Sequence, residues 1–305
     1  MYTRILVPMD GSKTAENVLP YARAFAGGFK VPVELLAVVD IGELATRIAP
    51  EKGRFIDTLI EDSLRHGENY LRQTARTFSG VNVNCSVKRG RAEEVIIETA
   101  ASDKGTFIAM ATHGRSGLDR WLLGSVAEKV LRGTSNPLVL IRASGEAKTE
   151  GEATLKTVIV PLDGSEMAES VLPAVVEISK KINLEVILFR AYSIPYSAYA
   201  GGDGYYAVNF DELISGVKED ARDYLQKKTE ELKKRGVEKV SYELKEGLSA
   251  DQIMSFAKKT PNSLIAMCTH GRSGIERWVL GSVTETVVRH SGNPVLIVRG
   301  SRAAA

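Results

Sequence analysis

Two nearly identical segments of this chain place glycine, serine, histidine and arginine in the same order. Residues 111–125 are ATHGRSGLDRWLLGS, and residues 268–282 are CTHGRSGIERWVLGS. Each segment follows an apolar run and leads into apolar residues at helical spacing, such as Leu122, Val126 and Val130, so the pattern predicts a strand, a glycine loop and a helix. The N–H groups of such a loop and the positive end of the helix dipole favour anions, phosphate above all. The sequence therefore predicts two phosphate sites.

An aspartate follows another repeated segment near the start of each half. Residues 3–12, TRILVPMDGS, contain Asp10, and residues 156–165, KTVIVPLDGS, contain Asp163. The apolar run predicts a strand, and Asp-Gly-Ser predicts the turn after it. The aspartate side chain can fix that turn or face a ligand, and the sequence leaves both roles open.

Strand and helix patterns alternate around these motifs. In the first half we expect strands over 5–7, 31–39, 81–87, 107–111 and 138–141, and helices over 15–26, 55–78, 92–101 and from the glycine loop through Leu131. We expect the pair Gly27-Gly28 to end the first helix. This alternation predicts an α/β fold, a Rossmann-like doubly wound parallel sheet of five strands with helices on both faces. Because the pattern repeats, we expect two such sheets in tandem.

The length of 305 residues fits two domains of ordinary size. A polar stretch rich in small residues separates the halves, so we expect a first domain over 1–143, a linker over 144–156 and a second domain over 157–305. The spacing of repeated residues places an insertion before the third strand of the second half. The divergent segment there, 193–210, is rich in glycine and tyrosine, and we expect it to be a lid or specificity loop.

Composition excludes several classes of function. Forty basic and 38 acidic residues leave a formal charge of +2, which argues against nucleic acid as the main partner. No apolar run approaches the ~18 residues of a membrane span, so we expect no membrane insertion. The two cysteines, Cys85 and Cys268, lie in apolar strand-like runs, and we expect both to be packed, reduced thiols. These features together predict a cytoplasmic protein.

On these motifs both halves resemble the universal stress protein family, and the whole chain resembles a tandem member. Nucleotide-binding members carry glycine, two residues, glycine, nine residues, then glycine followed by serine or threonine. Gly114 with Gly124-Ser125 matches the last three of these landmarks in the first half, and Gly271 with Gly281-Ser282 matches them in the second. The resemblance covers nearly all of both halves.

The chain departs from that pattern at its first glycine, where it has Ala111 and Cys268. If the position needs positive φ or close approach of a phosphate, a Cβ atom obstructs it. We therefore expect weaker ATP binding, especially in the second half.

The resemblance implies an adenine nucleotide as ligand, ATP in the first place, with Mg²⁺ as an accompanying ion. Ligands of doubly wound sheets bind outside the carboxyl ends of the strands, which independently supports the same place. In the first half the resemblance implies contacts from Pro8, Asp10, Val38, Ala111, His113, Gly114, Gly124, Ser125 and Val126. In the second half it implies contacts from Pro161, Asp163, Ala191, Cys268, His270, Gly271, Gly281, Ser282 and Val283.

Three functions remain open at this point. The first is a stress or regulatory protein whose shape or protein partners respond to a bound adenine nucleotide. The second is a nucleotide-free interaction protein, which Ala111 and Cys268 favour. The third is a slow ATP hydrolase, although the glycine loops carry no obvious carboxylate or lysine for phosphoryl transfer, and we assign no catalytic residue and no metal ligand.

The fifth strands of the two halves, 138–141 and 295–298, are apolar and lie on one chain. Apolar edge strands are usually covered. Because family members pair these strands between subunits, we expect them to pair here within the chain, as an internal pseudo-dimer that can assemble further.

Overall fold

The computed structural model describes the chain except for residues 43–55, 113–122, 143–148, 194–209, 270–279 and 301–305. The predicted loop over 193–210 therefore lies almost wholly outside the described residues. Within the described part, no helix combines the length and apolarity needed to cross a membrane.

The first half contains the five predicted strands and the predicted helices. Its elements are β1 (Arg4–Pro8), a 3-10 helix (Ala15–Val18), α1 (Leu19–Phe29), β2 (Val33–Val39), α3 (Ile56–Ala75), β3 (Val83–Arg89), α4 (Ala92–Ala101), β4 (Thr106–Ala111), α5 (Ser125–Gly133) and β5 (Leu138–Ile141).

The second half repeats this order. Its elements are β6 (Thr157–Pro161), α6 (Glu166–Glu169), α7 (Leu172–Ile182), β7 (Glu185–Tyr192), α8 (Phe210–Lys234), β8 (Val240–Glu246), α9 (Ser249–Lys259), β9 (Ser263–Cys268), α10 (Ser282–His290) and β10 (Val295–Val298).

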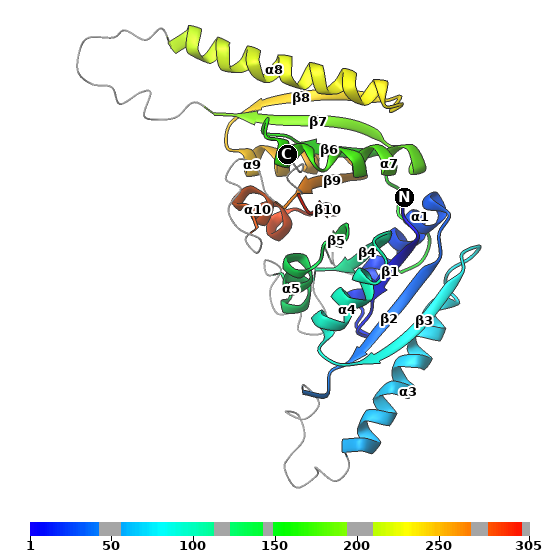
Figure 1. The fold of residues 1–305 in the computed structure, drawn as a ribbon. Helices are drawn as coiled ribbons and strands as arrows, with labels where there is room; N and C mark the ends of the chain where they lie inside the picture. Colours follow the sequence, from blue (N-terminus) through cyan, green and yellow to red (C-terminus); the bar gives the residue numbers. More distant parts are fainter. Residues whose placement is uncertain (43–55, 113–122, 143–148, 194–209, 270–279, 301–305) are drawn as a thin grey trace, which may run out of the picture.

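One ten-stranded sheet runs through the molecule in the order β3-β2-β1-β4-β5-β10-β9-β6-β7-β8 (Figure 1). Strands within each half are parallel, and β1 lies between β2 and β4 as β6 lies between β7 and β9. Strands β5 and β10 join the halves in antiparallel register, with Leu296 opposite Val139. The predicted doubly wound sheets and the pairing of the two fifth strands are thereby confirmed.

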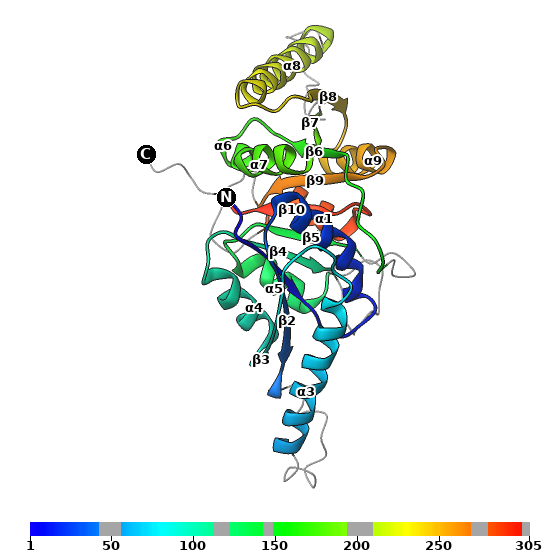
Figure 2. The same ribbon diagram turned by 90° about the vertical axis from the view of Figure 1, so that its right-hand side faces the viewer.

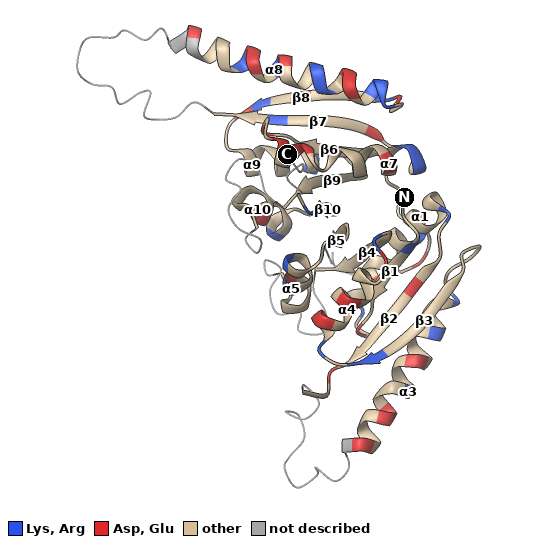
Figure 3. Ribbon diagram, viewed as in Figure 1, with Lys and Arg blue, Asp and Glu red and all other residues tan. Residues whose placement is uncertain are grey.

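Helices cover both faces of the sheet (Figure 2). Core residues of α1, α3, α7 and α8 pack on one face, and those of α4, α5, α9 and α10 pack on the other. Every residue of β4, β5 and β9 is buried, as expected for strands covered on both sides. The outer strands β3 and β8 are half-exposed, and Figure 3 shows that charged residues occur on them and along α3 and α8.

A second contact between the halves forms where α5 meets α10. Arg132 of α5 lies 3.0 Å from Glu128 and 4.0 Å from Glu285, and Arg289 of α10 lies 3.0 Å from Glu285 and 3.4 Å from Glu128. These four side chains are only 23–36% exposed. Each helix supplies one glutamate and one arginine, and each arginine contacts both glutamates. Such partly exposed ion pairs orient the two helices more than they stabilise them.

The prediction that Gly27-Gly28 ends the first helix was wrong. Helix α1 continues through both glycines and ends at Phe29, and the next residue, Lys30, has a left-handed backbone with φ 57°. A Cβ atom on Gly28 would overlap the Ile182 side chain of α7, whereas one on Gly27 would meet nothing within 4 Å. Gly28 is therefore needed for the close approach of α1 and α7 and does not stop the helix.

This difference predicts opposite effects of two adjacent substitutions. Gly27→Ala should stabilise the protein by roughly 0.5–1 kcal/mol, because alanine favours a helix interior over glycine. Gly28→Ala should destabilise it by about 1–2 kcal/mol, because overpacking against Ile182 exceeds that gain. Chemical denaturation of both variants checks the pair, and equal effects would show that α1 and α7 do not meet at Gly28.

The prediction of two packed thiols is right for one cysteine and wrong for the other. Cys268 is buried, but Cys85 is exposed. Cys85 lies on β3, which is one of the two edge strands of the sheet and has a neighbouring strand on one side only. Its partial burial raises the pKa of the thiol, with Arg72 acting in the opposite direction.

The described part of the expected linker is tied to the first half by one arginine. Arg23 of α1 donates from Nη1 to the carbonyl oxygens of Thr149 (2.7 Å) and Gly151 (2.8 Å). Its Nε also donates to the carbonyl of Thr77 at 3.1 Å, and its guanidinium lies 4.9 Å from the centre of the Phe78 ring. Burial lowers the pKa of this guanidinium.

Candidate functional site

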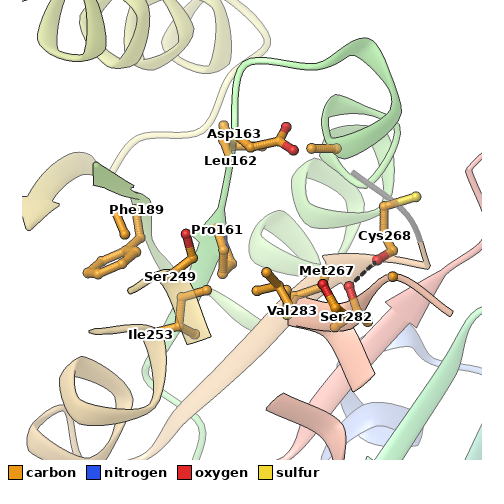
Figure 4. Close-up of a pocket in the computed structure, with 14 residues that line it drawn as sticks. Pro161, Leu162, Asp163, Phe189, Ser249, Ile253, Met267, Cys268, Ser282 and Val283 are labelled. Atoms are coloured by element: carbon orange, nitrogen blue, oxygen red, sulfur yellow. Dashed lines mark hydrogen bonds between the residues drawn. The ribbon is translucent and has the colours of Figure 1, made fainter. Parts of the chain in front are cut away.

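A cavity of about 250 Å³ lies at the carboxyl ends of the second-half strands (Figure 4). It opens where β6 neighbours β9, which is where the strand order of this half reverses. Seven residues predicted from the sequence line it together, namely Pro161, Asp163, Ala191, Cys268, Gly281, Ser282 and Val283.

The start of α10 forms one wall of the cavity. Gly281 precedes the helix with extended backbone (φ −62°, ψ 142°), and no side chain in the described part of the chain caps this helix. The Gly281 N–H donates to the carbonyl of Thr269 at 2.8 Å, and Thr284 Oγ1 donates to the carbonyl of Cys268 at 2.9 Å. The first N–H groups of a helix have no partner within it, so this wall is suited to an anion.

The first half builds the same helix start. The Gly124 N–H donates to the carbonyl of Thr112 at 2.7 Å, and Gly124 has φ −60° and ψ 147° before Ser125 begins α5. Val38 and Val126 are half-buried, and both pack against one core cluster. Pro8 is the last residue of β1, and Ala111 is the last residue of β4. Four predicted residues, His113, Gly114, His270 and Gly271, lie outside the described residues.

Both aspartates organise the turn that follows the first strand of their half. Asp163 Oδ1 accepts hydrogen bonds from the Ser165 N–H (2.9 Å) and Oγ (2.6 Å), and Ser165 Oγ in turn accepts from the Ala168 N–H at the start of α6. Asp10 and Ser12 repeat these contacts at 2.9 and 2.7 Å. The turn role is thus present in each half, and Asp163 also lines the cavity.

Helix α8 holds α6, the helix capped by Ser165, in place. The Tyr224 hydroxyl donates to Glu169 at 2.8 Å, and Lys228 Nζ donates to the same carboxylate at 2.7 Å. Burial, followed by the hydrogen bond and negative charge of Glu169, raises the pKa of Tyr224 strongly. The Asp163 turn therefore rests on a helix that is anchored to the core.

The backbone at Ala111 and Cys268 needs no glycine. The non-glycine residues with positive φ in the described part of the chain are Lys30, Asn183 and Asn262, so neither motif position is left-handed. Cys268 is 4% exposed, and its Sγ accepts a hydrogen bond from Ser170 Oγ at 3.2 Å. In Figure 4 the sulfur points away from Val283 and Ile253. The obstruction that positive φ would cause is therefore absent.

Sequence reasoning missed the apolar end of the cavity. Phe189 of β7 and Ser249 and Ile253 of α9 line it (Figure 4), and four further unpredicted residues line the rest of the cavity, namely Met267, Leu162, Ala168 and Thr284. Phe189 lies two residues before Ala191 on the same face of β7, so strand alternation from Ala191 could have identified it. The α9 residues carry no comparable signal, because their part in the cavity depends on how α9 crosses β7.

The two halves differ at the helices beside the cavity. In the first half, Lys129 Nζ of α5 donates to Glu93 of α4 at 2.7 Å. Burial alone would raise the pKa of Glu93, but the hydrogen bond from Lys129 and further hydrogen bonds and charges outweigh it and lower that pKa. The second half has Ala250 and Thr286 at these positions and cannot form this bridge.

Comparison with known proteins agrees with this architecture. The family model for the universal stress protein family matches residues 1–142 and again residues 154–299. A universal stress protein of Methanocaldococcus jannaschii is 34% identical over 152 residues, covering 49% of this chain and 85% of that protein.

Two further proteins match the chain over almost its whole length. One from Mycolicibacterium smegmatis is 20% identical over 308 residues, covering 97% of this chain and 96% of the relative. The crystal structure of a universal stress protein from Archaeoglobus fulgidus has the same fold, with a TM-score of 0.63 at 21% identity, covering 98% of this chain and 96% of the other. The chain therefore belongs to the universal stress protein family and carries two family domains in tandem.

Proposed function

We propose that this protein binds an adenine nucleotide, ATP in the first place, in the second-half cavity and changes its shape or its protein partners in response. One observation carries the proposal. The cavity joins an apolar chamber, which suits a flat base, to the start of α10, which suits an anionic group, so one ligand can contact both. The repeated helix start at Gly124 supports a second site in the first half.

The distribution of lining residues supports one direction for the proposed ligand. Phe189, Ile253 and Pro161 offer apolar surface for the base, while Ser282 and Val283 offer the first N–H groups of α10 for the phosphates. Asp163 lines the same cavity at the turn after β6. In this proposal Mg²⁺ binds only together with the phosphates of the nucleotide.

Helix α10 also provides a route by which binding could be transmitted. A ligand shifts a conformational equilibrium only when it binds one state better than the other. The helix that would hold the phosphates carries Glu285 and Arg289, which contact Glu128 and Arg132 of the first half. A small shift of α10 on binding would therefore change the contact between the two halves.

The direct test starts with freshly purified full-length protein. We expect denaturation to release an adenine nucleotide that chromatography and mass identify, and calorimetry with added ATP, with and without Mg²⁺, to give saturable heat after that nucleotide is removed. Neither released nucleotide nor binding heat would reject the proposal and leave the nucleotide-free interaction protein as the better account. Steady release of phosphate during the titration would instead indicate a slow hydrolase.

The geometry of Cys268 gives a prediction about the missing motif glycine. Cys268→Gly should change ATP affinity by less than about threefold, because the backbone of Cys268 is not left-handed and its sulfur accepts a hydrogen bond from Ser170. The same change should destabilise the protein by about 1 kcal/mol or more, since it removes a buried side chain and places glycine in a strand. Calorimetry and denaturation measure the two effects, and a large gain in affinity would show that the cysteine obstructs the ligand.

A further inference from the structure

Two serines mark opposite ends of the second-half cavity. Ser282 begins α10, beside Gly281, and Ser249 begins α9, beside the apolar residues Phe189 and Ile253. In Figure 4 the Ser249 hydroxyl faces the space next to Phe189 and Pro161, across the cavity from Ser282. Ser249 is half-buried, so its hydroxyl is partly withdrawn from bulk water.

The hydroxyl of Ser249 makes no hydrogen bond to the part of the chain that the structure describes. Thr284 also lines the cavity, but its hydroxyl donates a hydrogen bond to the Cys268 carbonyl at 2.9 Å. The chamber around Ser249 is otherwise apolar, with Phe189, Ile253 and Pro161 as neighbours in its wall (Figure 4). A partly buried hydroxyl gains a hydrogen bond when a ligand supplies the partner, and one well-placed polar group in an apolar pocket can fix the orientation of that ligand.

We propose that Ser249 is a specificity-determining residue whose hydroxyl hydrogen-bonds the edge of the six-membered ring of the bound adenine. This assignment rests on the proposed function, because it places the phosphates at Ser282 and the base at the far end of the cavity. A base packs its two faces against apolar walls but keeps polar atoms on its edge, and those atoms need a partner when water is excluded.

The first half lacks this group. The residue equivalent to Ser249 is Ala92, the first residue of α4. Alanine cannot form a hydrogen bond through its side chain, so the base of a nucleotide in the first half would not receive the hydrogen bond proposed for Ser249. The two halves should therefore differ in their discrimination between bases while sharing the same phosphate-binding helix start.

The test compares two ligands on the full-length chain carrying Gly124→Val, so that the first half does not contribute. One ligand is ATP, and the other is benzimidazole riboside 5′-triphosphate, whose six-membered ring has no hydrogen-bonding atom. We expect Ser249→Ala to weaken ATP binding by about 3- to 10-fold, the usual range for one neutral hydrogen bond, and to leave binding of the benzimidazole analogue unchanged. Ser249→Thr, which keeps the hydroxyl, should restore most of the ATP affinity.

Two further readouts separate a ligand contact from a structural effect. Inorganic tripolyphosphate should bind the Ser249→Ala chain as it binds the parent, and Ala92→Ser should leave ATP binding to the second half unchanged. Equal weakening of ATP and the benzimidazole analogue, or no weakening of either, would overturn the assignment of Ser249 while ATP binding itself stands. Absence of ATP binding to the Gly124→Val parent would overturn the proposed function for this half, and the assignment with it.

Discussion

Gly281→Val is expected to weaken ATP binding in the second half by at least about 100-fold. The phosphates are proposed to lie against the first N–H groups of α10, and a branched side chain at the residue before Ser282 would keep them away. Loss of two charge-assisted hydrogen bonds, each worth roughly 1.5–3 kcal/mol, accounts for an effect of that size. Calorimetric titration with ATP measures it.

The backbone of Gly281 makes this variant informative. The φ of −62° and ψ of 142° are a backbone conformation that valine adopts, and the N–H that donates to Thr269 remains. Loss of glycine before the helix should cost only about 1 kcal/mol of stability, so the folded protein survives. Gly124→Val is the matched variant for the first half. If Gly281→Val bound ATP as tightly as the unmodified chain, the phosphates could not lie at the start of α10.

The overall topology was predictable because it depends on patterns that repeat. Apolar runs such as 107–111 and 138–141 recur in the second half at corresponding places, and their burial on both faces follows from parallel pairing. The joining of β5 to β10 followed from the apolar character of both strands together with the behaviour of the family. None of these conclusions required knowledge of an individual side-chain contact.

The errors arose where a residue has its role through a distant partner. Gly28 resembles a helix stop in sequence, but its role is to admit Ile182 of the other half. Cys85 lies in an apolar run, but that run forms the edge of the sheet, where the alternation no longer ensures burial. Local patterns contain no information about which helix or strand will be the neighbour.

The candidate site was predictable in its anionic part and not in its apolar part. Asp163, Gly281 and Ser282 belong to motifs repeated in both halves, and the reversal of strand order brings them together. Ser249 belongs to no repeated motif, since Ala92 replaces it in the first half, and Ile253, which is matched there by Ile96, lies in a helix whose place beside the cavity the sequence does not show. The part of the site that distinguishes the two halves is thus the part that required the structure.

Leu296→Asp is expected to lower the free energy of unfolding by more than about 4 kcal/mol, because it buries an unpaired carboxylate in the strand that joins the halves. Leu296 is fully buried, lies opposite Val139 of β5 and opposite Ala266 of β9, and belongs to a core cluster that extends through both halves. Leu296→Ala, which removes packing without adding charge, should cost about 2–5 kcal/mol. Denaturant titration followed by circular dichroism compares the two variants.

Because β10 completes one sheet shared by both halves, the aspartate should also separate the unfolding of the two halves into two steps. A single transition at the original midpoint would mean that the β5–β10 pairing does not hold the halves together.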